Sequence, residues 1–167
     1  MRDRRGQLDI SFGMIFSIIV IIAVLAIGFY VIRYFTSLSA CTSAGMFYQD
    51  LSKSVDQAWA STSSSAVFTS SVPGAVEKVC FGNLTQPTES GSKDEYSALQ
   101  NRYPFGGRNN VYLYPVGVNT CTPDLGSYFI DHMQTSSFFC VSAKNGAVSV
   151  VVSKDSQDVL AKVQAKT

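Results

Sequence analysis

The sequence has little charge and almost no histidine. Only 15% of its 167 residues are Asp, Glu, Lys or Arg, whereas an average soluble domain has about 25%. The formal net charge is +1, so there is no basic excess to neutralise phosphates, and we expect no nucleic-acid partner. One histidine and few acidic residues provide few ligands for a metal centre. We therefore expect no metal, no cofactor and no enzymatic activity.

One uncharged segment accounts for much of this shortage of charged residues. The 23 residues from Ile10 to Ile32 carry no charge and are bounded by Asp9 and Arg33. As a helix they would extend about 35 Å, which exceeds the roughly 30 Å of a bilayer's hydrocarbon core. Because a lone apolar segment in lipid satisfies its backbone only as a helix, the sequence predicts one transmembrane helix.

Basic residues predict the orientation of this helix. Arg2, Arg4 and Arg5 precede it, and only Arg33 follows directly. The positive-inside rule then places the N-terminus in the cytoplasm and residues 34–167 outside the cell. We expect a single-pass protein of the cell membrane, with membrane lipid as a partner.

Two common interpretations of an N-terminal apolar segment fit poorly. A cleaved secretory signal has an apolar core of about 7–15 residues, and this one is longer. The sequence Leu38-Ser39-Ala40-Cys41 imitates a lipoprotein processing box, but Arg33 and Tyr34 separate it from the apolar core that it should close.

A third interpretation starts from Arg4-Arg5-Gly6-Gln7, which comes before the apolar run. This arrangement, together with the sequence from Ser11 to Phe16, resembles the class III signal peptide of archaeal type IV pilin-like proteins, in particular a group of small uncharacterised membrane-anchored members. The resemblance covers residues 4–35. It implies that a prepilin peptidase cuts between Gly6 and Gln7 on the cytoplasmic side and leaves the apolar helix on the mature protein.

The resemblance includes one departure and leaves two functions open. Bacterial pilins usually carry a glutamate five residues into the mature chain, where this sequence has Ser11 and the nearest acid is Asp9. Archaeal members often lack that glutamate. The resemblance implies a pilin-like cell-surface structural protein whose copies associate through the apolar helix. The alternative is a monomeric, membrane-tethered binding module that captures a ligand through its long outer loops.

The helical pattern continues over residues 34–60. Apolar residues recur there at spacings of three and four, as on one face of an amphipathic helix; they are Leu38, Cys41, Ala44, Tyr48, Leu51, Val55 and Ala58 or Trp59. Eight of the eleven residues from 61 to 71 are Ser or Thr, which ends the helix. The expected divisions are a leader (1–6), a transmembrane helix (7–33), an amphipathic helix (34–60) and a β-rich outer domain (61–167).

The sequence of the outer part predicts an α+β fold, in which the long helix packs on a small antiparallel sheet. We expect strands at 66–70, 76–81 and 111–115, a long exposed loop over 82–110, and a short C-terminal helix from about 156 to 165. Asn145-Gly146 is typical of a two-residue hairpin turn and would pair residues 139–144 with 147–152. The buried face of that hairpin would carry Phe139, Val141, Ala143, Val148, Val150 and Val152.

All four cysteines, Cys41, Cys80, Cys121 and Cys140, lie in the predicted outer part. An even number in an extracellular setting favours two disulfides, with free or mixed thiols as the alternative. Cys80 and Cys140 both fall in expected strands, so we favour that pair, which leaves Cys41 with Cys121.

The remaining candidate features are weaker. Asn83-Leu84-Thr85 is an N-glycosylation sequon. His132 follows Asp131, but the sequence has no G-x-S-x-G elbow, so we interpret His132 as a loop residue and not a catalytic one. We interpret the acidic pair Asp94 and Glu95 as solvated. For the aromatic residues Tyr103, Phe105, Tyr112 and Tyr114, we favour core packing or loop anchoring over a ligand-facing patch.

Overall fold

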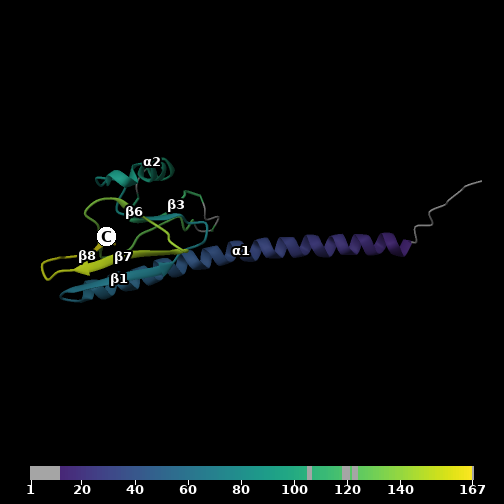
Figure 1. The fold of residues 1–167 in the computed structure, drawn as a ribbon, viewed down its shortest axis with the longest axis horizontal. Helices are drawn as coiled ribbons and strands as arrows, with labels where there is room; N and C mark the ends of the chain where they lie inside the picture. The colour runs from purple at the N-terminus through teal and green to yellow at the C-terminus, as the bar shows by residue number, and fades with distance from the viewer. Residues whose placement is uncertain (1–11, 105–106, 118–120, 122–123, 167) are drawn as a thin grey trace, which may run out of the picture. The chain divides into compact units, whose positions relative to one another are not determined.

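The computed structural model describes residues 12–104, 107–117, 121 and 124–166. The chain separates into two compact units, Met1–Thr36 and Ser37–Thr167. One helix, α1 (Phe12–Ala60), contributes residues to both units and is drawn from purple to blue in Figure 1. The helix ends at Ala60, where the Ser-rich segment begins. Its residues 37–60 form one unit with the β-strands.

The second unit contains two four-stranded sheets. The first sheet has the order β1-β7-β8-β5, and the second sheet has the order β4-β3-β2-β6. All neighbouring strands are antiparallel except β5 and β8, which are parallel. The strands are β1 (Ser64–Ser71), β2 (Lys78–Phe81), β3 (Val111–Tyr114), β4 (Ser127–Tyr128), β5 (Met133–Gln134), β6 (Phe139–Ser142), β7 (Ala147–Lys154) and β8 (Ala161–Ala165). The α+β class holds, with two sheets where the sequence predicted one.

The second sheet separates two apolar cores because its side chains alternate between its faces. On β2, Val79 and Phe81 enter the larger core, whereas Cys80 between them enters the smaller one. On β3, Leu113 points into the larger core and Tyr112 into the smaller. The larger core lies against the first sheet and α1, and the smaller core lies under α2 (Lys93–Arg102); Figure 1 shows α2 on the far side of β3 and β6 from α1.

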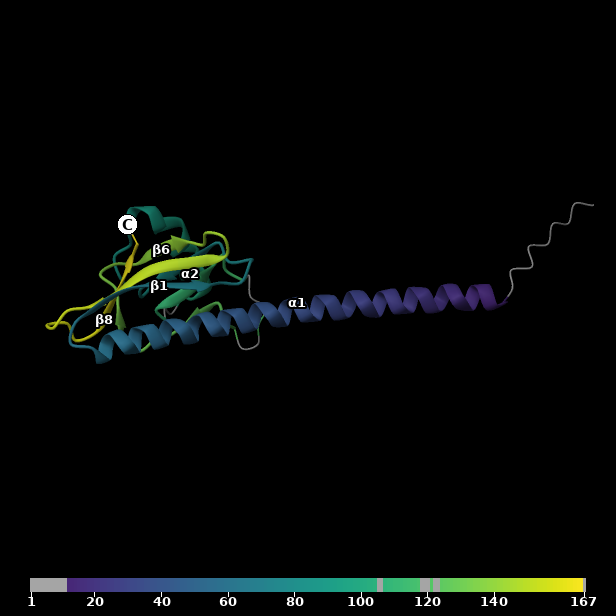
Figure 2. The same ribbon diagram turned by 60° about the horizontal axis from the view of Figure 1, so that its bottom comes forward.

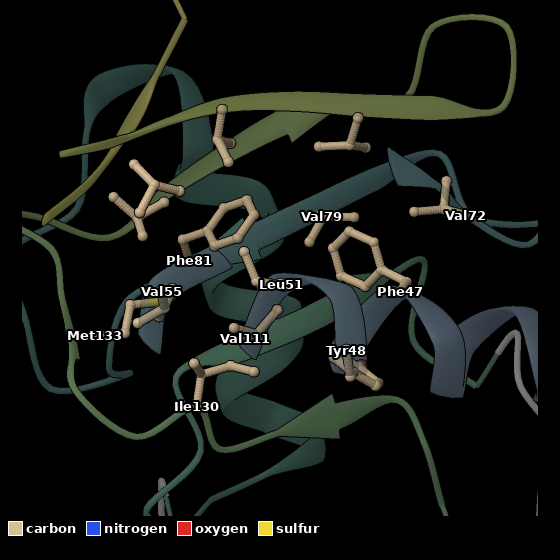
Figure 3. Packing of buried hydrophobic residues seen from close by; sticks show 14 of the residues in the cluster. Phe47, Tyr48, Leu51, Val55, Val72, Val79, Phe81, Val111, Ile130 and Met133 are labelled. Atoms are coloured by element: carbon tan, nitrogen blue, oxygen red, sulfur yellow. The ribbon is translucent and has the colours of Figure 1, made fainter. Parts of the chain in front are cut away.

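The second half of α1 supplies one wall of the larger core. Six of its residues are buried at helical spacings: Ala44, Phe47, Tyr48, Leu51, Val55 and Ala58. The sequence predicted all of these except Phe47, and it also placed on this face Leu38, which is 50% exposed. Figure 3 shows Leu51 and Phe47 pointing towards Val79 and Phe81 of β2. The Tyr48 hydroxyl donates to the carbonyl oxygen of Leu125 at 2.8 Å, and burial raises the pKa of this phenol. A polar group in the core is thus satisfied.

The expected loop over 82–110 is wrong, because it contains α2, preceded by the 3₁₀ turn η1 (Ser90–Ser92). Asp94 and Glu95 lie in the first turn of α2 and Arg102 in its last, which suits the helix dipole. Leu99 is fully buried. Glu95 is also buried and accepts a hydrogen bond from Lys78 of β2, so the solvated interpretation of this acid is wrong as well.

The expected hairpin at 139–152 has the right turn and the wrong partners. Asn145 and Gly146 both have positive φ, at 53° and 71°, as the two-residue turn requires. Only the first pair, Lys144 with Ala147, forms across it. Beyond that bridge β6 pairs with β2, whereas β7 pairs with β1 and β8. The alternation did identify the inward-facing residues, because all six lie in or against the larger core.

The expected C-terminal helix is wrong. Residues Ala161–Ala165 form β8, and Val163 stands opposite Val152 of β7. Asp155 and Asp158 close the tight connection between the two strands, since the Asp155 backbone N–H donates to the Asp158 carboxylate at 3.1 Å. Val159, which the helical pattern placed on an apolar face, is 81% exposed.

Candidate functional site

The apolar part of α1 has its side chains exposed. It contains an 18-residue window with a mean hydropathy of 3.0, and none of that window is buried. By length and composition this helix could cross a membrane. Seventeen large apolar residues here are each between 42% and 73% exposed. They are Met14, Ile15, Phe16, Ile18, Ile19, Val20, Ile21, Ile22, Val24, Leu25, Ile27, Phe29, Tyr30, Val31, Ile32, Tyr34 and Phe35.

The polar side chain of Ser17 forms a hydrogen bond within the apolar segment itself. The Ser17 hydroxyl donates to the backbone carbonyl of Gly13, one turn earlier, at 2.8 Å. A hydroxyl bonded in this way needs no water, so it is compatible with an apolar environment. Ser17 therefore does not interrupt the apolar surface.

Aromatic residues mark the C-terminal end of the apolar segment. Phe29, Tyr30, Tyr34 and Phe35 flank Arg33, and each is between 58% and 73% exposed. Tyrosine and arginine at the end of an apolar helix suit the boundary between hydrocarbon and water, because each has an apolar body and a polar tip. These residues therefore lie where a membrane-spanning helix that starts near residue 10 would emerge from the hydrocarbon core.

The predicted processing residues, Gly6 and Gln7, lie outside the described residues, as do Asp9 and Ser11. The expected cut between Gly6 and Gln7 therefore stays a prediction of the sequence.

Both disulfides favoured from the sequence are present. Cys41 of α1 is bonded to Cys121, with 5.7 Å between their Cα atoms, and Cys80 of β2 is bonded to Cys140, which is directly opposite on β6. The first bond attaches the long helix to the segment between β3 and β4. A sulfur in this bond cannot carry a lipid, so the structure does not favour the lipoprotein alternative for Cys41.

The sequon at Asn83 lies in a folded turn between β2 and η1. The Asn83 side-chain oxygen accepts hydrogen bonds from the Thr85 backbone N–H and hydroxyl, both at 3.0 Å. The carbonyl of the buried Leu84 accepts from Tyr96 and Gln100 of α2. Asn83 itself is half-buried, and the hydrogen bonds described for its side chain use the oxygen and not the amide nitrogen that a glycan would occupy.

His132 pairs with an acid that the sequence did not identify. Its Nδ1 lies 3.1 Å from Asp56 of α1, and its ring stacks on Trp59 with 3.7 Å between ring centroids. The Trp59 indole N–H donates to the Val159 carbonyl at 3.2 Å. These contacts hold the end of α1 to two later segments. Asp56 and His132 are 76 residues apart, so spacing alone gave no signal for the pair.

The aromatic residues considered as a ligand-facing patch pack inside the domain. Tyr112 is fully buried, and its ring lies 5.8 Å from that of Tyr103 and 6.4 Å from that of Phe138. Burial raises the pKa of Tyr112 to about 12. Tyr114 lies against the same smaller core, and Phe105 is outside the described residues.

Among the described residues, no group of three or more His, Cys, Asp or Glu side chains is placed to hold a metal ion. Comparison of the chain with protein-family models, with curated proteins and with solved structures gave no match. The function is therefore argued from the residues of the chain itself.

Proposed function

We propose that the protein is a pilin-like structural protein of the cell surface, held in the membrane or assembled with copies of itself through the apolar part of α1. Its N-terminus would lie in the cytoplasm, and residues 34–167 would be displayed outside. The resemblance of residues 4–35 to the archaeal class III signal supports processing by a prepilin peptidase after Gly6. Membrane lipid and further copies of the chain are the partners that an exposed apolar helix accepts.

The exposure of seventeen large apolar side chains between Met14 and Phe35 is the observation that carries this proposal. Full burial of such a side chain is worth about 1.5–3 kcal/mol, so covering the exposed part of each would gain a large share of that transfer free energy. A helix with apolar residues all round is stable only where lipid or other apolar helices cover it. The same helix then changes to a one-sided pattern after residue 37, where it becomes part of a folded domain.

The disulfides support the orientation. Disulfides persist in oxidising compartments and are rare in the cytosol. Cys41–Cys121 and Cys80–Cys140 are both on the C-terminal side of the apolar segment. An orientation with this side outside the cell agrees with the arginines that precede the segment.

Mass spectrometry of the native N-terminus tests the proposal. The expected terminus is Gln7, and the Gly6→Val variant should retain Met1, whereas the control Gly28→Ala should be processed like the wild type. Sheared and pelleted surface fractions would then be examined for the same processed chain. Wild-type protein that keeps Met1 and remains monomeric in membranes would contradict the pilin-like function and favour the tethered binding module.

A further inference from the structure

A groove opens where β6 and β7 separate. The two strands are bridged only at Lys144 and Ala147, and each then joins a different sheet. Figures 1 and 2 both show β8 ending beside β6 and β7. The cavity has a volume of about 620 Å³. Pockets that hold small ligands generally measure about 300–1,000 Å³, so this one has room for more than a single small ion.

One wall of the groove is a row of polar groups across the first sheet. Thr69 of β1 stands opposite Ser149 of β7, and their hydroxyl oxygens are 2.8 Å apart. β7 and β8 are antiparallel and pair Val150 with Ala165. The residue that follows β8, Lys166, therefore lies beside Ser149, on the side opposite to Thr69. Thr69, Ser149 and Lys166 therefore lie in one row across the first sheet, and all three line the groove.

The end of β6 and its turn line the groove as well. They contribute the polar residues Lys144, Asn145 and Ser142. Val141 and Ala147 add small apolar surfaces. Among the residues that the structure describes, no Asp or Glu lines the groove. Within the described part of the chain, neither lysine takes part in an ion pair.

We propose that this groove binds an acidic saccharide. The two ammonium groups would bind a carboxylate or sulfate of the sugar, and the hydroxyls and the amide, which can both donate and accept, suit ring hydroxyls. Val141 and Ala147 offer contact to the apolar faces of sugar rings. None of the described residues that line the groove is aromatic, so no such ring could stack on a nucleobase and a single-stranded nucleic acid fits less well.

The inference goes beyond the proposed function, since a pilin-like subunit and a tethered module could both carry such a site. Titration calorimetry of the full-length protein in detergent micelles tests it, with a hyaluronan hexasaccharide as the acidic probe. Chitohexaose supplies a neutral saccharide of equal length, and tripolyphosphate supplies charge without hydroxyls. The hexasaccharide should bind saturably, its affinity should fall with added salt, and both controls should bind more weakly.

Two sets of variants locate the site. Replacing both cations in Lys144→Gln/Lys166→Gln should weaken hexasaccharide binding at least about tenfold, because each loses a charge-assisted contact. The matched control Lys53→Gln/Lys93→Gln, which removes two exposed lysines outside the groove, should leave the affinity unchanged. Thr69→Val should weaken binding of the hexasaccharide and not binding of tripolyphosphate.

Each opposite result overturns part of the proposal. Absence of hexasaccharide binding at millimolar concentration would reject the site. Equal affinity for chitohexaose would reject the requirement for an anionic group. Equal affinity for tripolyphosphate would show a site for anions in general, and an unchanged affinity in the double lysine variant would place binding elsewhere. Processing at Gly6 is measured separately, so its failure leaves these outcomes unaffected.

Discussion

The ammonium group of Lys154 on β7 lies 2.6 Å from the carbonyl oxygen of Trp59, in the last turn of α1. The same group donates to the Ser61 carbonyl at 3.2 Å. Carbonyl groups at the C-terminal end of a helix have no partner within it, and the helix dipole favours a cation there. A lysine from the sheet thus caps the C-terminal end of the helix that carries the apolar segment.

Replacing this lysine should destabilise the outer domain. We expect Lys154→Met to lower the free energy of unfolding by about 1–2 kcal/mol, because it leaves the carbonyls of Trp59 and Ser61 at the end of the helix without a charged donor. Thermal unfolding in detergent, followed by near-ultraviolet circular dichroism, measures the change. Lys93→Met removes a lysine at the start of α2 and should have little effect. An equal loss in both variants would show that the Lys154 contacts add nothing specific.

The pair formed by Glu95 and Lys78 should make stability depend on pH. The hydrogen bond from Lys78 lowers the pKa of Glu95 below its ordinary value of 4.5, and the same bond raises the pKa of Lys78 above 10.5. The acid's contribution is therefore complete above about pH 4.5 and is lost as the pH falls through the lowered pKa. The lysine's contribution is complete below about pH 10.5 and is lost as the pH rises through the raised pKa.

Urea unfolding between pH 3 and 7 tests the acidic side of this dependence. Glu95→Gln should cost about 1–3 kcal/mol at pH 7 and should flatten the dependence between pH 3 and 5. Asp94→Asn, at the neighbouring position, should keep the slope of the wild type. The assignment to Glu95 fails if its variant retains the full slope.

The two disulfides should differ in their rates of reduction. Cys41 and Cys121 are both half-buried, whereas in the second bond Cys80 is completely buried and only Cys140 is half-buried. Because exchange needs a thiolate to reach a sulfur atom, we expect Cys41–Cys121 to be reduced first under native conditions. Timed alkylation and peptide mapping identify the released cysteines, and the difference should disappear in denaturant. Release of Cys80 and Cys140 first would contradict the structure.

The sequence predicted which residues face the core more accurately than it predicted which strands pair with each other. The alternation from Phe139 to Val152 reflects a sheet with one buried face, and that burial is a local property. The partner of each strand is not local. β7 pairs with β1, about 80 residues earlier, and nothing in residues 139–152 distinguishes that partner from β6.

The same limit explains the errors at the C-terminus and in α2. Val159, Leu160 and Val163 fit a helical spacing, but the pairing of Val163 with Val152 decides the structure. A local pattern predicts that a charged residue such as Glu95 is exposed, whereas its burial depends on the hydrogen bond from Lys78, which is distant in the sequence. The groove could not be predicted because it requires β6 and β7 to separate. The disulfides could be predicted, because Cys80 and Cys140 both fall in expected strands and that favoured one pairing.

A pair of lysines in the apolar segment should prevent membrane insertion. Ile21 and Leu25 lie one turn apart near its centre and are 58% and 59% exposed. A lysine at the centre of a membrane helix costs about 2.5–3.5 kcal/mol, so Ile21→Lys/Leu25→Lys should cost about 5–7 kcal/mol. We expect the variant to move from the carbonate-resistant membrane fraction to the soluble fraction in cells.

The control places two lysines on the second part of the same helix. Met46 is 57% exposed and Gln49 is exposed as well, so Met46→Lys/Gln49→Lys makes an equal change of charge in a segment that we expect to face water. This control should remain in membranes. Cysteine alkylation gives a second measurement, because an outer domain that fails to leave the cytosol stays in a reducing compartment. All four cysteines should then react in the apolar-segment variant and none in the control, and membrane retention of both variants with intact disulfides would contradict the assignment of the span.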